Sequence, residues 1–397
     1  MSVRCVPLGE VVLEANPGFA SGERSASGIL QVRMNCVTPD GELNLQVAPR
    51  VPAPPNISRY LLEPDDVLFN STNSPELVGK CARFDGHTEP VTFSNHFLRL
   101  RTNRDRLEPT YLARWIGHQW KRRVFEGMCT QWVNQASVHA ERLLQLQIPL
   151  PRPAEQRRIA ALLDKADAVR RKRRESLLLL DDFLHSAFLE MFGDPVRNER
   201  GWEVAHLDDV ARVVSGVTKG RDLRGRDTVH VPYLRVANVQ DGRIDLQQVK
   251  SIEATAEEIA QYRLVVGDIL LTEGGDPDKL GRGAVWLGEI GECIHQNHVF
   301  RVRLTHRTLL PEYLSALLGS VYGKRYFLKA AKQTTGIASI NRRQLGAFPV
   351  LLAPNDSQSR YAAMVKAVRR TVVTLQLACT SAERLFNALA HRAFATR

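Results

Sequence analysis

The feature that most constrains the fold of this chain is an internal repeat. The segment that begins at Tyr60 aligns without a gap with the segment that begins at Tyr262, at an offset of 202 residues. Between 60–143 and 262–345 the two copies share 23 identities in 84 positions, where composition alone gives roughly one in sixteen. The sequence therefore predicts one structural design used twice.

Composition places the chain among ordinary globular proteins. Its 397 residues suffice for two domains, and 44% hydrophobic with 24% charged residues excludes disordered and fibrous classes. No segment reaches the roughly 18 apolar residues of a membrane span and the first residues lack a signal-peptide pattern, so we expect a cytoplasmic protein. The six cysteines show no zinc-ligand spacing, which predicts reduced, mostly buried thiols and no metal.

Each copy of the repeat mixes strand and helix patterns. Short β-rich runs such as GDILLT and VFRVRL alternate with Gly, Asp and Pro, whereas PEYLSALLGSVYGKRYFLKAA has helical periodicity. This mixture predicts an α+β domain with a twisted, mostly antiparallel sheet in each copy.

A long helix is predicted after each copy. Pro153 suits the first turn of a helix and FGDP at 192–195 ends it, so the first helix should run from about Ala154 to Met191. The second should begin at Asn355 or Asp356 as N-cap. Apolar residues at 3/4 spacing form the predicted helix-helix seam, which is interrupted at Arg173. The seam residues are Ile159, Leu162, Ala166, Leu177, Leu180 and Leu184 in the first helix and Tyr361, Met364, Val368, Leu375, Phe386 and Leu389 in the second.

Two such seams in one chain favour an antiparallel coiled coil with one repeat copy at each end of a rigid spacer. The alternative is that each helix folds back on its own domain as a surface helix. The predicted fold class is α+β, with two pseudo-repeated domains joined by two long helices that pack as an antiparallel coiled coil. The predicted parts are a first domain at 1–152, a spacer helix at 153–192, a linker at 193–200, a second domain at 201–354 and a C-terminal spacer helix at 355–397.

The motifs of enzymes are missing from the sequence. It contains no GxxxxGK[ST], HExxH or GxGxxG motif. NPGF at 16–19 and GGDPDK at 274–279 are interpreted as turns, the latter because its repeat partner TNSPEL does not keep the carboxylates. Asn95-His96 and Asn297-His298 are interpreted as structural polar residues at the start of a strand. No catalytic residue is predicted.

The balance of charge favours a polyanionic partner. The formal net charge is +11, and arginine and lysine are the residues that neutralise phosphates and read guanine. The run RRKRR at 170–174 suits either DNA backbone, an acidic partner or a solvated helix face, and the glycine-rich loops are candidates for base readout. The DNA-binding candidates are Arg99, Arg101, Arg122, Arg123, Lys219, Arg221, Arg224, Arg301, Arg303, Arg325 and Arg342.

IPLPRPAEQRRIAALLDKADAV, followed by LLLLDDFLHSAFLEMFGDPVRNERGWEVAHLDDVARVVSG, resembles the central helix and second-domain start of specificity (S) subunits of Type I restriction-modification enzymes. The resemblance implies a non-catalytic subunit whose two target-recognition domains each read half of a bipartite, asymmetric DNA site. It implies helices that set the gap and dock two modification (methyltransferase) subunits, with Glu155 and Gln156 as docking candidates, and restriction subunits that join this core. S-adenosylmethionine, ATP and magnesium would belong to those partners. The second helix begins with PNDSQSRY and lacks the glutamate, which puts one docking contact in doubt.

Two other classes of protein are also compatible with the sequence. A fused nuclease or methyltransferase would be indicated by S-adenosylmethionine binding to the isolated protein. A scaffold that binds two proteins would associate with little dependence on salt, whereas DNA binding weakens steeply as salt rises.

Overall fold

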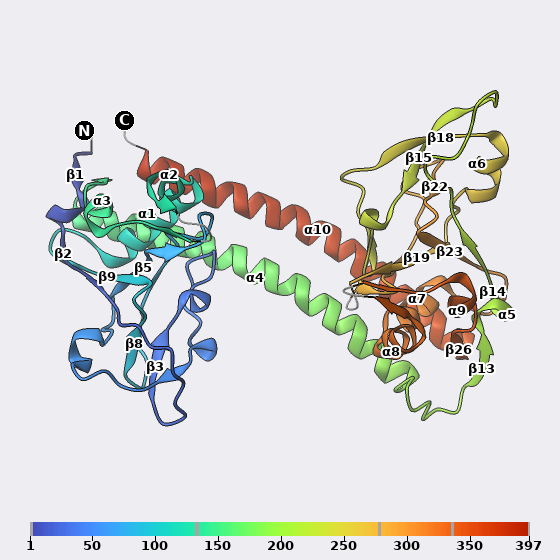
Figure 1. Ribbon diagram of the computed structural model, residues 1–397, viewed down its shortest axis with the longest axis horizontal. Helices are drawn as coiled ribbons and strands as arrows, with labels where there is room; N and C mark the ends of the chain where they lie inside the picture. Colours follow the sequence, from blue (N-terminus) through green and yellow to red (C-terminus); the bar gives the residue numbers. More distant parts are fainter. Residues whose placement is uncertain (1–2, 132–134, 277–278, 335–336, 396–397) are drawn as a thin grey trace. The chain divides into compact units, whose positions relative to one another are not determined.

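The computed structural model describes residues 3–131, 135–276, 279–334 and 337–395 (Figure 1). The chain divides into two compact units. Unit 1 consists of Met1–Arg174 and Leu377–Arg397, and unit 2 consists of Glu175–Gln376. Both units combine sheets and helices, which confirms the predicted α+β class.

Two sheets form the body of unit 1. The four-stranded antiparallel sheet has the order β2-β9-β5-β7, and the three-stranded sheet has the order β4-β3-β8 with β3 and β8 parallel. The strands are β2 (Val12–Pro17), β3 (Ile29–Val32), β4 (Arg50–Val51), β5 (Val67–Asn70), β7 (Cys81–Arg83), β8 (Val91–Phe93) and β9 (Phe97–Thr102). All four residues of β5 are buried, as expected for a central strand covered on both faces.

Unit 2 repeats both sheets, in the orders β14-β23-β19-β21 and β18-β15-β22. Its strands are β14 (Ala211–Ser215), β15 (Val229–Leu234), β18 (Lys250–Ala254), β19 (Ile269–Thr272), β21 (Gly283–Val285), β22 (Ile294–His295) and β23 (Val299–Leu304). The register is repeated too, since Leu68 pairs with Arg99 in unit 1 and Leu270 with Arg301 in unit 2. The predicted internal repeat is therefore a repeat of structure.

Smaller elements complete each unit. Two-stranded sheets join β1 (Cys5–Pro7) to β12 (Gln147–Pro149) and β13 (Glu203–His206) to β26 (Pro349–Leu352). Further strands are β6 (Thr72–Asn73), β10 (Thr130–Gln131) and β11 (Ala136–Ser137) in unit 1, and β16 (Val239–Gln240), β17 (Arg243–Ile244), β20 (Gly274–Gly275), β24 (Lys332–Thr334) and β25 (Ile337–Ser339) in unit 2. The short helices are α1 (Pro109–Lys121), α2 (Val124–Met128), α3 (Ala140–Leu144), α5 (Leu207–Val210), α6 (Ala256–Tyr262), α7 (Pro311–Gly319), α8 (Val321–Ala330) and α9 (Arg342–Gly346).

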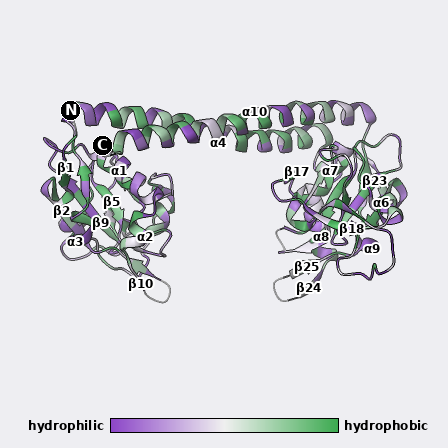
Figure 2. Cartoon of the chain, turned by 90° about the horizontal axis from the view of Figure 1, so that it is seen from above, coloured by the Kyte–Doolittle hydropathy of each residue, from purple (hydrophilic) through white to green (hydrophobic). Residues whose placement is uncertain are grey.

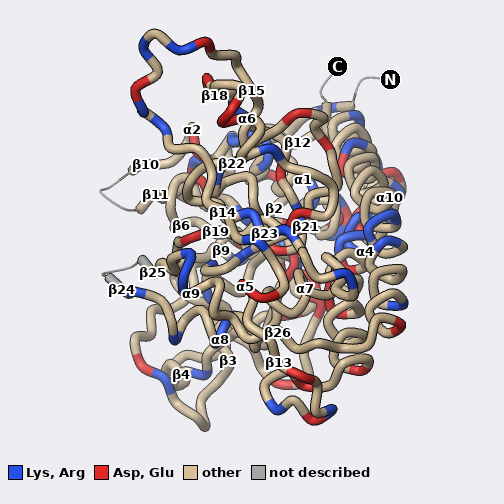
Figure 3. The backbone as a smooth tube through the Cα atoms, turned by 90° about the vertical axis from the view of Figure 1, so that its right-hand side faces the viewer, with Lys and Arg blue, Asp and Glu red and all other residues tan. Residues whose placement is uncertain are grey.

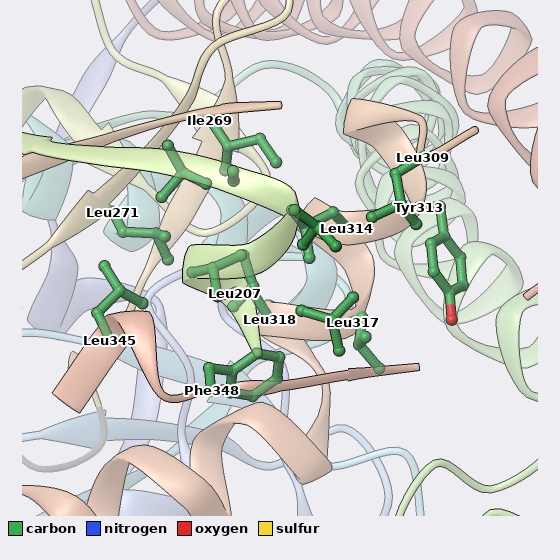
Figure 4. Packing of buried hydrophobic residues seen from close by; sticks show 14 of the residues in the cluster. Leu207, Ile269, Leu271, Leu309, Tyr313, Leu314, Leu317, Leu318, Leu345 and Phe348 are labelled. Carbon is green, nitrogen blue, oxygen red and sulfur yellow. The ribbon is translucent and has the colours of Figure 1, made fainter. Parts of the chain in front are cut away.

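The core of each unit lies between its sheets and short helices. In unit 2, Leu314 and Leu317 of α7 pack in the same buried cluster as Ile269 and Leu271 of β19 (Figure 4). Gly79 in unit 1 has φ +91°, and a Cβ there would lie 2.3 Å from the ring of Phe125. A Cβ on its counterpart Gly281 would lie 2.4 Å from the ring of Phe327. In both copies the backbone conformation and the nearby ring therefore require glycine.

The two long helices are α4 (Pro153–Phe192) and α10 (Asn355–Phe394). Hydrophobic and hydrophilic residues alternate along both of them (Figure 2). Each helix contributes one half to each unit. Within unit 1, Arg170 bonds to Glu383 and Arg173 to the carbonyl oxygen of Ala378, so the two helices run antiparallel, as predicted.

Unit 2 contains the other helix pairing, and its contacts are aromatic. The ring of Tyr361 on α10 lies 5.6 Å from Phe188 and 5.7 Å from Phe192 on α4. Tyr361, Val368 and Phe386 of the predicted seam are buried, while Leu177, Leu180, Leu184, Met364, Leu375 and Leu389 are half-buried.

In the first half of α4, the most buried residues are not those of the predicted seam. The buried residues there are Gln156, Ala160, Leu163, Asp167 and Arg170, which keep 3/4 spacing one residue away from the predicted positions. Leu162 is 44% exposed, and Ile159 and Ala166 pack at the margin of the core. Three of these five buried positions are polar, so an apolar pattern does not reveal them.

Candidate nucleic-acid interface

Two of the predicted DNA-binding arginines lie inside the units. Arg99 on β9 is 3% exposed and Arg301 on β23 is 4% exposed. Nη1 of Arg99 donates to the carbonyl oxygens of Arg59 and Leu61 at 3.1 and 2.9 Å, and Nη1 of Arg301 donates to those of Gln261 and Arg263 at 3.1 and 2.8 Å. These bonds therefore hold the same segment of the fold in each unit. Because both arginine side chains are buried, the expectation that they lie on a DNA-facing surface is corrected.

The next arginine on each strand forms a two-point pair with a buried aspartate. Nε and Nη2 of Arg101 donate to Asp66 at 2.8 and 3.2 Å, and those of Arg303 donate to Asp268 at 2.7 and 2.8 Å. The bond to the aspartate raises the pKa of each guanidinium. A guanidinium held in this way by a carboxylate is engaged within the fold, which argues against direct DNA contacts for Arg101 and Arg303.

The other candidates are nearer the surface. Arg122, Arg123, Lys219, Arg224, Arg325 and Arg342 are exposed, and Arg221 is half-buried. Arg123 and Arg325 are counterparts at the repeat offset and occupy the beginning of α2 and the middle of α8. Arg342 also bonds to the carbonyl oxygen of Val213. The exposed members of this set stay as candidates for binding DNA.

The two docking candidates lie in different environments. Glu155 is on the surface and pairs with Arg158 one turn away, which lowers the pKa of its carboxyl. Gln156 is fully buried. Its Oε1 accepts from the backbone of Glu108 at 2.9 Å, and its Nε2 donates to the carbonyl oxygens of Arg106 and Pro151 at 2.8 and 2.9 Å. The prediction that Gln156 contacts a partner is therefore corrected, since all three of these bonds are internal.

Gln358 occupies the equivalent position in unit 2 and makes the equivalents of two of these bonds. Its Oε1 accepts from the backbone of Leu310 at 2.9 Å, and its Nε2 donates to the carbonyl oxygen of Ala353 at 2.7 Å. The glutamine is thus the part of the helix start that both copies share. Comparing the two helix starts at the repeat offset is the sequence signal that could have revealed this structural role.

Unit 1 contains a buried charge network that the sequence did not predict. Asp167 and Arg170 on α4 are each 1% exposed and bond to each other. Arg170 also pairs with Asp40 at 2.9 Å and Glu383 at 3.1 Å, and Arg114 pairs with Asp167 at 3.0 Å. A helical wheel places this run around the helix but does not identify which arginine is buried.

Two further arginines of the RRKRR run also pair with acidic residues. Arg171 pairs with Glu42, and Arg174 pairs with Asp40 at 2.5 Å and Glu383 at 3.1 Å. Together with α1 and the 38–46 segment, this part of α4 borders a cleft of about 1130 Å³ within unit 1. The side chains around the cleft carry both signs of charge, which fits no single class of charged ligand.

The described residues of the motifs singled out in the sequence occupy strand ends, bends and turns. Within the described ranges, no cluster of three or more His, Cys, Asp or Glu residues could hold a metal ion. In NPGF, Asn16 and Pro17 end β2, Gly18 lies against the carbonyl oxygen of Phe93, and Phe19 forms a bridge with Ser94, so the interpretation of this motif as a turn is wrong. Two residues of GGDPDK, at 277–278, lie outside the described residues. Asn95-His96 and Asn297-His298 form turns that precede β9 and β23.

The cysteines are unpaired thiols. Cys36, Cys81 and Cys293 are buried, and Cys5, Cys129 and Cys379 are half-buried. Burial raises the pKa of Cys81 and of Cys293 to about 12, so these thiols are protonated at neutral pH and are poor nucleophiles.

The fold consists of two copies of one α+β design, and the comparison with known families matches a segment that includes part of the first copy. Residues 53–178 match the family described as "Type I restriction modification DNA specificity domain". The resemblance to Type I specificity subunits seen in the sequence is thereby confirmed.

The sequence relatives carry the same description. The chain is 28% identical over 176 residues to a chain named as the type I restriction enzyme MjaX specificity subunit of Methanocaldococcus jannaschii, an alignment that covers 44% of this chain and 41% of that one. It is 25% identical to the type I restriction enzyme EcoKI specificity subunit of Escherichia coli over 62% of this chain and 54% of the relative. It is 24% identical to the StySPI specificity subunit of Salmonella potsdam over 83% and 71%. The chain thus spans about half the length of the first two relatives.

Solved structures share the fold. The S subunit of a Type I restriction-modification system from M. genitalium superposes with a TM-score of 0.58 at 11% identity, over 100% of this chain and 97% of that one. A chain from a study of complex assembly and conformational transition of the type I R-M system gives 0.56 at 20% identity, over 99% and 97%. At these identities the two likenesses show the fold alone. Among the described residues, no helix is long and apolar enough to cross a membrane.

Proposed function

We propose that this protein is the sequence-specific DNA-binding specificity subunit of a Type I restriction-modification complex. The observation that supports this most strongly is the repetition of one DNA-specificity architecture. The family match covers 53–178, and unit 2 has the same sheet orders and the same internal arginine and glutamine bonds. Two similar units suit a bipartite site, and their different surface side chains suit two different half-sites.

In this proposal, 1–152 and 201–354 are the two target-recognition domains. The helices at 153–192 and 355–397 set the distance between the half-sites, and 193–200 is a linker. The exposed cations Arg122, Arg123, Lys219, Arg325 and Arg342 supply contacts to phosphates or bases. Duplex DNA is the substrate, and the chain itself carries out no chemistry.

The partners follow from the same proposal. Two modification subunits that methylate adenine dock on the helices, with exposed Glu155 as one contact, and restriction subunits join that core. S-adenosylmethionine, ATP and magnesium are used by those subunits. The proposed compartment is the cytoplasm, where duplex DNA is accessible to such a complex.

A domain exchange tests the proposal. The 201–354 segment is replaced with the corresponding segment of a specificity subunit that reads a different site, and the hybrid is expressed with the modification subunits. One half of the methylated motif should change while the other half and the spacing remain. A hybrid that changes both halves, or neither, contradicts the assignment of one half-site to each unit.

Two controls separate the alternatives. The isolated chain should bind duplex DNA with a steep dependence on salt, whereas a protein-binding scaffold would not. The isolated chain should also fail to bind S-adenosylmethionine, and tight binding would favour the methyltransferase alternative.

A further inference from the structure

The loop between β14 and β15 interrupts the repeat. Gly216 approaches the carbonyl oxygen of His295 as Gly18 approaches that of Phe93, so these glycines begin equivalent loops at an offset of 198. After the loops, Leu234 pairs with His295 as Val32 pairs with Phe93, at an offset of 202. The loop of unit 2 is therefore longer by the difference between these offsets, which is four residues.

The longer loop is also more basic. The segment 217–228 contains Lys219, Arg221, Arg224 and Arg226 against two aspartates, whereas the equivalent segment 19–26 contains one glutamate and one arginine. Along the tube, basic and acidic residues follow each other on the loop beside β15 and β18 (Figure 3). The surplus of positive charge is therefore specific to unit 2.

Arg221 anchors the base of this loop. Its guanidinium pairs with both carboxylate oxygens of Glu258 on α6, and both side chains are 18% exposed. It also donates to the carbonyl oxygens of Glu253 and Thr218 at 2.6 and 3.1 Å. These contacts fix where the loop leaves the domain, and they occupy the charge of Arg221.

The remaining basic residues project from the anchored base. Lys219, Arg224 and Arg226 are exposed, and Arg224 pairs with Asp222. Gly220 and Gly225 have φ +80° and +74°, and a Cβ on either would meet nothing within 4 Å. Space around the backbone lets the loop follow the surface of a partner.

We propose that the loop Val217–Thr228 is a phosphate-contacting arm of unit 2, positioned by Arg221, with Lys219 and Arg226 on the DNA backbone. The inference rests on the proposed function, and it implies that unit 2 makes phosphate contacts that unit 1 does not make with the equivalent loop. Phosphate is the fitting ligand because the arm carries a surplus of exposed positive charge, a lysine ammonium acts on phosphate as a point charge, and contacts to the DNA backbone position a protein without reading sequence. Unit 1 has no equivalent arm.

The test is the salt dependence of duplex binding by the full chain, measured by fluorescence anisotropy. In the double variant Lys219→Ala/Arg226→Ala, the slope of log K against log salt should fall by about 1.8, since each phosphate contact contributes about 0.9. Affinity at 0.1 M salt should fall roughly tenfold to a hundredfold on every duplex sequence. The control Arg197→Ala/Arg200→Ala removes the same charge from an exposed segment of unit 2 and should leave the slope unchanged.

Arg221 is tested through its geometry and not its charge. Arg221→Lys keeps the positive charge but loses the two-point pairing with Glu258. Amide exchange of 217–228 should accelerate and affinity should fall, while the salt slope stays the same because the bound state neutralises the same phosphates. Unchanged exchange and affinity would refute the positioning role.

Three outcomes overturn the arm. They are a double variant with an unchanged slope, a control variant with an equal loss, and a loss confined to one duplex sequence, which would indicate base reading. If the unaltered chain binds no duplex in a salt-dependent way, the proposed function fails; if it binds and the double variant binds equally, only the arm fails.

Discussion

Replacement of Gln156 by alanine separates an internal role for this residue from the docking role that the sequence suggested. The side chain is fully buried, accepts one backbone hydrogen bond and donates two. Each buried polar group left without a partner costs about 1–3 kcal/mol. Because water entering the space can satisfy part of this loss, we expect a destabilisation of unit 1 by about 2–5 kcal/mol.

Hydrogen exchange with mass spectrometry measures this effect within each unit separately. For Gln156→Ala, amide protection around Glu108 and the first turns of α4 should fall by about 30-fold to a few thousandfold, at 1.4 kcal/mol per factor of ten. Gln358→Ala is the matched variant and should produce the same loss in unit 2 only. Glu155→Ala alters an exposed pair and should change protection little.

The reasoning is refuted if Gln156→Ala leaves protection within a few-fold of the unaltered protein. If that variant at the same time fails to bind modification subunits, the docking role suggested by the sequence returns. If Glu155→Ala instead weakens modification-subunit binding with protection unchanged, Glu155 is the docking residue.

Three other perturbations have defined outcomes. Burial lowers the pKa of His295 to about 4 from about 6.5 when unfolded, so unit 2 should keep its full stability above pH 6.5 and lose roughly 3 kcal/mol as pH falls to 4. The variant His295→Phe introduces the residue that unit 1 has at the equivalent position, Phe93, and should remove this pH dependence in urea titrations. A pH dependence that persists in the variant would contradict the assignment to His295. Asp167→Ala leaves buried Arg170 without its nearest partner and should destabilise unit 1 by about 3–5 kcal/mol, whereas the double variant Asp167→Leu/Arg170→Met should destabilise it much less. Equal losses of stability in the two variants would show that an unpaired buried charge is not the cause of the destabilisation. Seven residues inserted into both α4 and α10 lengthen each by about 10.5 Å and keep the seam register, so methylation sequencing should show a new half-site spacing with unchanged half-sites; altered half-sites at the old spacing would count against the spacer role.

The sequence predicted most of the architecture because the repeat and the helix boundaries are local or periodic signals. The predicted start and end of the first helix differ from Pro153 and Phe192 by one residue each. The most buried residues of its first half were not predicted because Gln156, Asp167 and Arg170 are polar. Their burial depends on partners distant in the sequence, such as Glu108, Arg114 and Glu383, which no periodicity reveals.

The candidate interface was less predictable for a similar reason. Arg99 and Arg301 look like surface cations in an alternating strand, yet carbonyl groups about 40 residues away bury them. Only the repeat gave a usable signal, since both arginines, their aspartate-paired neighbours and both glutamines recur at the same offset. These residues, which are identical in both copies, stabilise the shared fold. The loop at 217–228 differs between the copies and is the candidate for contacts to DNA that only unit 2 makes.

The most direct measurement of the central claim is single-molecule methylation sequencing of the host genome with this gene intact and with it deleted. The account predicts that deletion removes one bipartite adenine-methylation motif and that restoring the gene restores both half-sites at their original spacing. A methylome that is the same with and without the gene, in cells that contain active modification subunits, would contradict the claim that this chain selects the methylated sequence.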